Sequence, residues 1–182
     1  MAGKVEIINI ALARLGESPI QSLTEDSVPA SMAGLLYDSA RRSTLRDFNW
    51  NFAISMAGLA RVDYSPVDFR FAYALPADCL RVIRLRGEVP FSIRKDRLYT
   101  DTESAELEYV VDVTDEALFD AKFVEAMTYK LASELAMPIK GSSELMASYS
   151  NAYSTFIRQA ATESAGENRV HLSENPYVEA RL

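Results

Sequence analysis

The sequence predicts an α+β fold, in which a four-helix bundle carries an inserted small antiparallel β-sheet domain and ends in an extended C-terminal tail. Apolar residues recur at helical spacing toward both ends of the chain, whereas residues 50–112 alternate as strands do. With 182 residues, 48% of them hydrophobic and 25% charged, the chain is long enough to bury a core. We therefore divide it into N-terminal helices (1–49), an inserted β subdomain (50–112), C-terminal helices (113–166) and an extended C-terminal arm (167–182).

The N-terminal part predicts two helices joined by a sharp turn. Apolar spacing predicts a helix over residues 3–15, and Gly16 ends it because glycine readily adopts the left-handed conformation. After a loop, Asp26 or Ser27 is placed to cap a second helix that runs to about residue 48. The side chains that we expect this helix to bury are Met32, Leu35, Leu36, Ala40 and Leu45.

The period of the apolar pattern shortens after Trp50, the only tryptophan of the chain. Aromatic residues then alternate with small or charged ones, and Lys95-Asp96 separates two apolar arms as the tip of a hairpin would. The alternation predicts one small antiparallel sheet with one apolar and one solvated face. The aromatic side chains could instead stack on single-stranded nucleic acid, but an acidic protein favours packing in the core. These aromatic residues are Phe69, Phe71, Tyr73 and Tyr99.

The C-terminal part predicts two more helices. Thr114 and the two acids after it indicate the start of a helix that reaches residue 137. Pro138 and Gly141 then force a turn, and Ser142 is placed to cap a last helix that ends near residue 165. Its apolar face consists of Leu145, Tyr149, Tyr153, Phe156 and Ala160. The polar arm that follows has too few apolar groups to pack by itself and would normally be disordered. What would hold it in place is a neighbouring chain or, alternatively, a crystal contact or the chain's own bundle.

The net charge of −7 is unevenly distributed. Residues 61–100 carry a net charge of +3, whereas residues 101–144 carry −8. An acidic protein is a poor candidate for wrapping DNA, because DNA binding neutralises phosphates with basic side chains. The asymmetry indicates either head-to-tail complementarity between copies or ordinary solvated faces.

Three arginines gather near the end of the second predicted helix: Arg41, Arg42 and Arg46. Cations near a helix C-terminus interact favourably with the helix dipole, and this effect alone accounts for the three arginines without a partner protein. The alternative is that they contribute to an interface between subunits.

No catalytic motif is present, and we expect no enzymatic activity, no cofactor and no metal site. The single histidine, His171, lies in the polar arm, and the single cysteine, Cys79, lies in a turn without a base beside it, as a small buried hydrophobe would. One cysteine is also compatible with a reducing compartment. No apolar run approaches the roughly 20 residues of a membrane span, and no secretory signal is visible, so we expect a soluble protein made inside the cell, without a membrane partner.

The sequence resembles the tail tubular protein A family, the head-to-tail adaptors of short-tailed bacteriophages and related prophages. The resemblance covers most of residues 5–165 and depends on Gly16-Glu17-x-Pro19, Trp50-Asn51-Phe52 and Leu75-Pro76 in this order. It implies a structural protein of the virion tail or neck, assembled in the host cytoplasm. It also implies a homo-oligomeric ring, typically of twelve copies, that joins the portal protein to the tail nozzle protein. Double-stranded DNA would pass through the channel of this ring.

On exposure and charge, we expect the hairpin tip Arg94, Lys95, Asp96 and Arg97 to face the next tail component. We expect the arm around His171, Pro176, Tyr177 and Val178 to dock on a neighbouring subunit or on the portal, with Tyr177 as an aromatic anchor. Two rival interpretations remain at this point. One is a small non-viral enzyme with a site between bundle and sheet, using Asp78 and Cys79, and the other is a monomeric peptide-binding module that uses a sheet edge.

Overall fold

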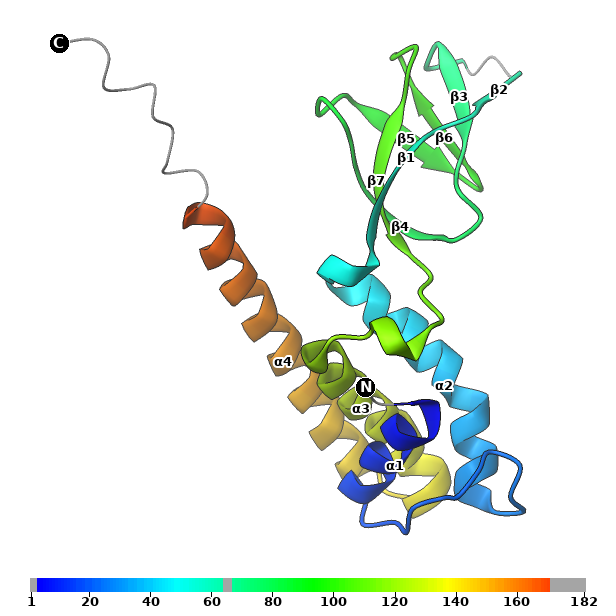
Figure 1. Cartoon of the computed structure of the whole chain (residues 1–182), viewed down its shortest axis with the longest axis vertical. Coiled ribbons are helices and arrows are strands. Elements are labelled where there is room, and N and C mark those ends of the chain that lie inside the picture. The colour runs from blue at the N-terminus through cyan, green and yellow to red at the C-terminus, as the bar shows by residue number, and fades with distance from the viewer. Residues whose placement is uncertain (1–2, 64–66, 171–182) are drawn as a thin grey trace, which may run out of the picture. The chain divides into compact units, whose positions relative to one another are not determined.

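Four α-helices and two small antiparallel sheets make up the residues that the computed structural model describes, 3–63 and 67–170 (Figure 1). The predicted α+β class is confirmed. The chain forms two units, which we call the helical unit (described residues 5–37 and 125–170) and the sheet unit (described residues 3–4, 38–63 and 67–124). Each unit is described by itself below.

The first helix and its turn form as the sequence predicts. Helix α1 (Lys4–Arg14) is followed by Gly16 at φ 68°, whose N–H donates to Ala13 at 3.0 Å. The loop after it folds back onto α1 because the Asn9 side chain bonds both backbone groups of Ile20, at 2.9 and 3.0 Å. Ile20 is consequently only 3% exposed.

Helix α2 (Val28–Asp47) begins at the predicted cap, since the Ser27 hydroxyl accepts from the Ala30 N–H at 3.3 Å. The predicted burial of Leu35 is wrong, because this side chain is 71% exposed. At 3.6 residues per turn, Leu35 lies on nearly the opposite side of the helix from the stripe that is buried. That stripe consists of Ala30, Ala33, Tyr37, Ala40, Thr44 and Leu45.

The third helix starts later than predicted. Asp115 caps only a short 3-10 turn, η2 (Glu116–Leu118), by accepting from the Ala117 N–H at 3.0 Å. Helix α3 (Ala121–Leu135) begins after a second cap, Asp120, which accepts from the Phe123 N–H at 2.6 Å. Two successive aspartates thus divide what the sequence predicts as one helix. Most of α3 is buried, including Ala126, Met127, Thr128, Leu131, Ala132, Ser133 and Leu135.

The last helix follows the predicted turn but extends further. A π-helical turn, η3 (Ala136–Lys140), contains Pro138 and ends at Gly141 with φ 61°. Ser142 caps helix α4 (Ser143–Val170) by accepting from the Leu145 N–H at 3.2 Å. Because α4 continues to Val170, residues 167–170 are helical and the predicted helix end near residue 165 is wrong.

Side-chain contacts connect α1, α3 and α4 within the helical unit. The Arg14 guanidinium lies 3.7 Å from the centre of the Tyr129 ring and donates to Thr128, while the Arg14 carbonyl accepts from the Tyr149 hydroxyl. Glu17, in the turn after α1, forms an ion pair of 2.6 Å with Lys140. These contacts fix three helices to one another, and a bundle of all four helices stays a prediction.

The strands of the sheet unit divide into two sheets, so the prediction of a single sheet is wrong. The first sheet has the order β1 (Ile54–Gly58), β7 (Glu106–Val111), β4 (Cys79–Leu85). The second has the order β2 (Arg61–Val62), β3 (Phe71–Ala74), β6 (Arg97–Thr100), β5 (Phe91–Arg94). The chain changes sheets directly after β1, because Leu59 donates to Ala105 in the first sheet whereas Ala60 accepts from Ala74 in the second.

The two sheets share one apolar core. Tyr73 and Phe71 pack in it and Tyr99 is buried, which confirms packing as the role of these three aromatic residues, whereas Phe69 is half-buried. Tyr73 and Leu98 from the second sheet pack with Leu85, Leu107 and Tyr109 from the first. Tyr73 is 2% exposed, and its hydroxyl donates to the carbonyls of Thr102 and Glu103 at 2.9 and 2.7 Å.

Trp50 closes helix α2 and leads into β1. Its indole N–H donates to the Thr44 carbonyl at 2.8 Å. That carbonyl is one of the last four of α2, which have no partner inside the helix. The Trp50 ring is 2% exposed and makes edge contacts with Phe48 and Phe123, at centroid distances of 4.8 and 5.3 Å. The tryptophan therefore acts as a buried cap for the C-terminus of α2.

A second connection holds the other end of the strands on α2. Asp112, directly after β7, accepts from Arg41 at 2.5 Å and from Arg42 at 2.8 Å. Arg41, which is 4% exposed, also donates to the Val113 carbonyl at 2.5 Å. Burial raises the pKa of the Asp112 carboxyl, but the hydrogen bonds and charges of both arginines outweigh burial and leave this pKa below its ordinary value of 3.8.

We predict that Trp50→Phe lowers the free energy of unfolding by about 1–3 kcal/mol. Phenylalanine retains an aromatic ring beside Phe48 and Phe123 but leaves the Thr44 carbonyl buried without a donor. Urea unfolding followed by circular dichroism measures the change. The control Leu35→Ala, at an exposed position of the same helix, should change stability by less than about 0.5 kcal/mol. Equal effects of the two substitutions would contradict the capping role.

We predict that Asp112→Asn lowers stability at pH 7 by about 3 kcal/mol, because it removes the carboxylate 2.5 Å from the buried Arg41 cation and leaves only the exposed Asp38, 3.6 Å away. The folded-state pKa of Asp112 lies below 3.8, so its ionic contribution is complete at neutral pH and is lost as the pH falls below 3.8 through the folded value. The difference between variant and wild type should therefore shrink between pH 4 and pH 2 in urea titrations. If the stability difference between Asp112→Asn and wild type stays the same at low pH, this role of Asp112 is excluded. The control is Asp26→Asn, a substitution at an exposed position.

Candidate assembly surface

The hairpin between β5 and β6 presents a basic tip. Arg94 and Arg97 pair directly across it, and Lys95 and Asp96 form its two-residue turn. Lys95 adopts φ 58°, the left-handed conformation that two-residue hairpin turns require. Arg94 forms an ion pair of 2.6 Å with Asp68, yet its side chain remains 55% exposed. The structure thus brings the four predicted tip residues together on a defined turn.

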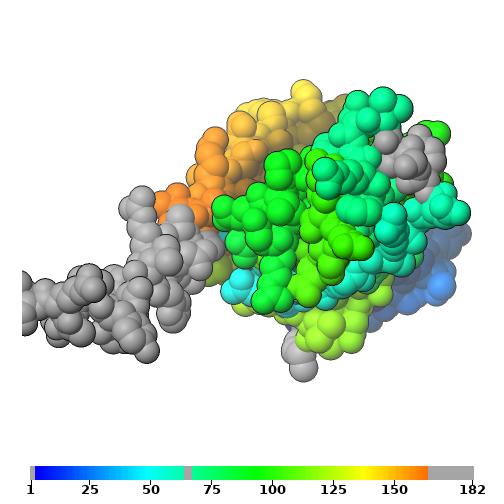
Figure 2. All heavy atoms as spheres, turned by 90° about the horizontal axis from the view of Figure 1, so that it is seen from above, coloured from blue at the N-terminus to red at the C-terminus, as the bar shows by residue number. Residues whose placement is uncertain are grey.

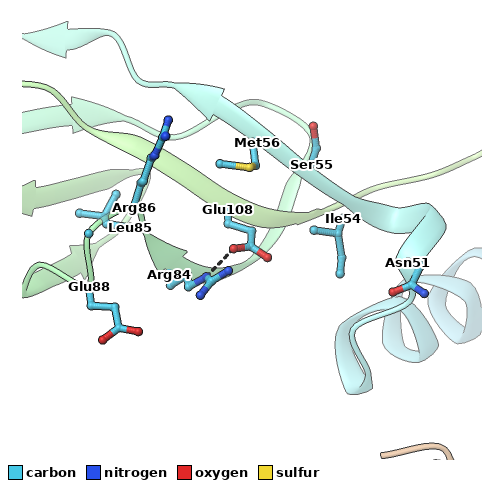
Figure 3. A pocket seen from close by; sticks show the side chains of 10 residues that line it. Asn51, Ile54, Ser55, Met56, Arg84, Leu85, Arg86, Glu88 and Glu108 are labelled. Carbon is cyan, nitrogen blue, oxygen red and sulfur yellow. Dashed lines mark hydrogen bonds and ion pairs between the residues drawn. The ribbon is translucent and has the colours of Figure 1, made fainter. Parts of the chain in front are cut away.

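A groove of about 800 Å³ runs over the outer face of the first sheet (Figure 3). Side chains from β1, β4 and β7 line it, with Met56 and Ser55 on one strand and Arg84 and Glu108 on the others. Arg84 lies 2.5 Å from Glu108, and Arg86, beside them, lies 2.7 Å from Glu106. Hydrogen bonds to these carboxylates raise the pKa of both guanidinium groups. The face is therefore an open surface of ion pairs beside an exposed methionine.

The space-filling view shows how this unit presents its strands. Residues of the β1–β3 region (cyan to teal) and of the β4–β7 region (green) lie side by side on the face toward the viewer in Figure 2. Among the described residues, no group of three or more histidine, cysteine or carboxylate side chains is arranged to hold a metal ion. A partner protein could recognise this surface by its charges, its shape and its strand edges.

The structure makes Cys79 a poor nucleophile. Burial raises the pKa of its thiol, and the negative charge of the neighbouring Asp78 raises it further, against the smaller effect of Arg46. A catalytic cysteine needs a lowered pKa so that the thiolate is present at neutral pH. Asp78 instead serves the fold, since its carbonyl accepts from the Asp112 N–H at 2.8 Å.

The three arginines predicted at a subunit interface have partners within their own chain. Arg41 is buried against Asp112, so it supports the fold and offers no surface to a second subunit. Arg42 and Arg46 are exposed, although Arg42 also bonds Asp112 and Arg46 donates to the Leu80 carbonyl. Sequence reasoning missed Asp112 as the partner of these arginines. The available signal was a carboxylate directly after the two valines that end the predicted last strand.

The remaining predicted interface residues, His171, Pro176, Tyr177 and Val178, lie outside the described residues. Within residues 3–63 and 67–170, none of the helices combines the length and apolar character needed to cross a lipid bilayer.

Comparison with known proteins identifies the family. The family model described as tail tubular protein matches residues 5–123, which include α1, α2 and every strand of both sheets. No curated protein matches the chain. The matched region also contains the three sequence segments that carry the resemblance, around Gly16, Trp50 and Leu75. The chain therefore belongs to the tail tubular protein family, the structural proteins of bacteriophage tails.

Proposed function

We propose that this protein is a head-to-tail adaptor, which joins the portal protein to the tail nozzle protein. Copies would form a closed ring of about twelve, since repeated head-to-tail contacts generate a ring when their rotation closes. The observation that carries the proposal is the family match over residues 5–123, which places the chain in the tail of a virion. The proposed role is structural and involves no enzymatic step.

The distribution of charge supports repeated contact between unlike surfaces. The hairpin tip carries Arg94, Lys95 and Arg97 against one acid, Asp96, whereas residues 101–144 carry a net charge of −8. Opposite charges steer association and suppress wrong partners. In a ring, the basic tip is well suited to dock on an acidic surface of the next tail component, and Arg42 and Arg46 are suited to contact a neighbouring subunit. The C-terminal arm, with Tyr177 as an anchor, would reach the portal or the neighbouring subunit.

The same acidity suits passage of DNA through the ring. A channel wall that is negatively charged repels phosphates, so double-stranded DNA would slide through without being held. The net charge of −7 supports this use better than a DNA-binding role.

Mass measurement in solution tests the adaptor role. The protein should form closed rings when the portal protein of the same phage is added, and the complex should then bind the nozzle protein. Native mass spectrometry would count the copies directly. A protein that stays monomeric with the portal present, under conditions where the portal itself is assembled, would contradict the proposal.

We predict that Lys95→Asn weakens binding of the assembled ring to the nozzle protein by about 2- to 5-fold, with a smaller dependence on salt. Asparagine removes the charge but tolerates the positive φ of this turn, so the hairpin should persist. Surface plasmon resonance at two salt concentrations measures both effects. Lys122→Gln, an exposed lysine of α3, is the matched control and should bind as wild type does. If both variants bind equally, the tip does not face the nozzle.

A further inference from the structure

Two of the four edge strands in the described sheets have little protection against pairing with another chain. Natural edges are kept from pairing by short length, charges, proline or bulges. Strand β2 has only two residues, and β4 contains two register shifts and exposed Arg84. Strand β5 has Pro90 and Arg94 at its two ends, but residues 91–93 between them are uncharged and in regular register. Strand β1 has five residues, Ile54–Gly58, without charge, proline or register shift. Residues 52–60 contain no charged side chain at all.

The register shows which backbone groups of β1 face outward. In an antiparallel pair, alternate residues exchange both hydrogen bonds with the partner strand. The Leu59 N–H donates to the Ala105 carbonyl at 2.8 Å. Every second residue of the strand faces the same way, so the backbone groups of Ala57 and Ser55 also bond β7. The N–H and C=O groups of Ile54, Met56 and Gly58 therefore point away from β7, toward the open edge.

This open edge is also hollowed and apolar at its centre. A hollow of about 260 Å³ is lined by Met56, Ala57, Gly58 and Glu106 and adjoins the larger groove. The Met56 side chain is 59% exposed (Figure 3). A strand added here would bury Met56 and satisfy the outward backbone groups of three residues.

The chain itself contains a complementary edge in β5. Arg94 and Arg97 flank the two-residue turn and form a hydrogen-bonded pair, which puts the backbone groups of Ile93 and Phe91 on the outer side of β5. Ile93 is 43% exposed, so each edge has one large apolar side chain near its centre. Charged side chains near both edges are paired within the chain: Arg94, the last residue of β5, with Asp68, and the two glutamates of β7 beside β1 with Arg84 and Arg86.

We propose that β1 of one copy pairs with β5 of the next copy, so that the two sheets of neighbouring subunits join into continuous sheets around the ring. This inference rests on the proposed ring and names the contact that closes it. Pairing of β1 with β1 is isologous and would close a dimer instead of a ring. Pairing of β1 with β5 joins two different edges and buries Met56 against Ile93. The contact is heterologous, as a ring requires.

The test is Met56→Pro, assembled with the portal protein and counted by native mass spectrometry. The Met56 N–H faces the open edge, so proline removes no hydrogen bond within the chain but blocks strand addition. Association between copies should weaken by at least about tenfold, while circular dichroism and melting temperature stay close to wild type. Met56→Lys, which adds an edge charge without altering the backbone, should weaken association in the same direction. The matched control is Met146→Lys, at another exposed methionine, on α4.

Cross-linking identifies the strand that occupies the edge. Copies with Met56→Cys are mixed with copies carrying Ile93→Cys, both in a Cys79→Ala background, and treated with a short bismaleimide after assembly. The proposal requires cross-links between the two kinds of copy. Two results would overturn the strand pairing without contradicting the proposed ring. One is cross-linking only between identical Met56→Cys copies, and the other is wild-type assembly by both Met56→Pro and Met56→Lys. If the wild-type chain forms no ring with the portal, the adaptor role itself is wrong.

Discussion

The Asp112 carboxylate, held between the guanidinium groups of Arg41 and Arg42, is the constraint on which the sheet unit depends. The chain leaves helix α2 at Trp50, runs through the seven strands of its described residues and returns beside α2 at Asp112. At the exit, the Trp50 indole caps a carbonyl of α2, and at the return, two arginines of α2 bind one carboxylate. Both ends of a segment of more than sixty residues are thus fastened to one helix. The strands between them can vary without losing their attachment.

The surfaces of the sheet unit, and not its interior, are the parts suited to function. The interior of the sheet unit is filled by packing residues such as Tyr73, Leu98 and Leu107, and its buried charge serves the fold. What remains outside is a basic hairpin tip, a face of paired arginines and glutamates, and one uncharged strand edge. A tail tubular protein works by contact with other virion proteins. Surfaces held on a rigid frame perform that work better than mobile segments would.

Much of the fold follows from local chemistry that the sequence displays. The turns at Gly16 and Gly141 and the caps Ser27 and Ser142 have short-range causes, and the structure confirms each. The errors come from choices that tertiary packing decides. Leu35 is exposed because it lies opposite the stripe of α2 that is buried, and a second aspartate, Asp120, delays the third helix. The division into two sheets depends on hydrogen bonds of Leu59 and Ala60 to distant segments, which periodicity does not contain.

The candidate surface was predictable to a similar degree. The hairpin tip could be found because its turn lies between two short strands, whereas the role of Arg41 could not, since its partner Asp112 is 71 positions away. We propose that copies of this chain join through their sheet units into a ring between portal and nozzle. Electron cryomicroscopy of the assembled portal and tail would show the ring and its contacts. We expect a closed ring in that position, with β1 of each copy beside β5 of the next. A single copy, a position away from the channel, or a ring in which β1 remains open to solvent would contradict it.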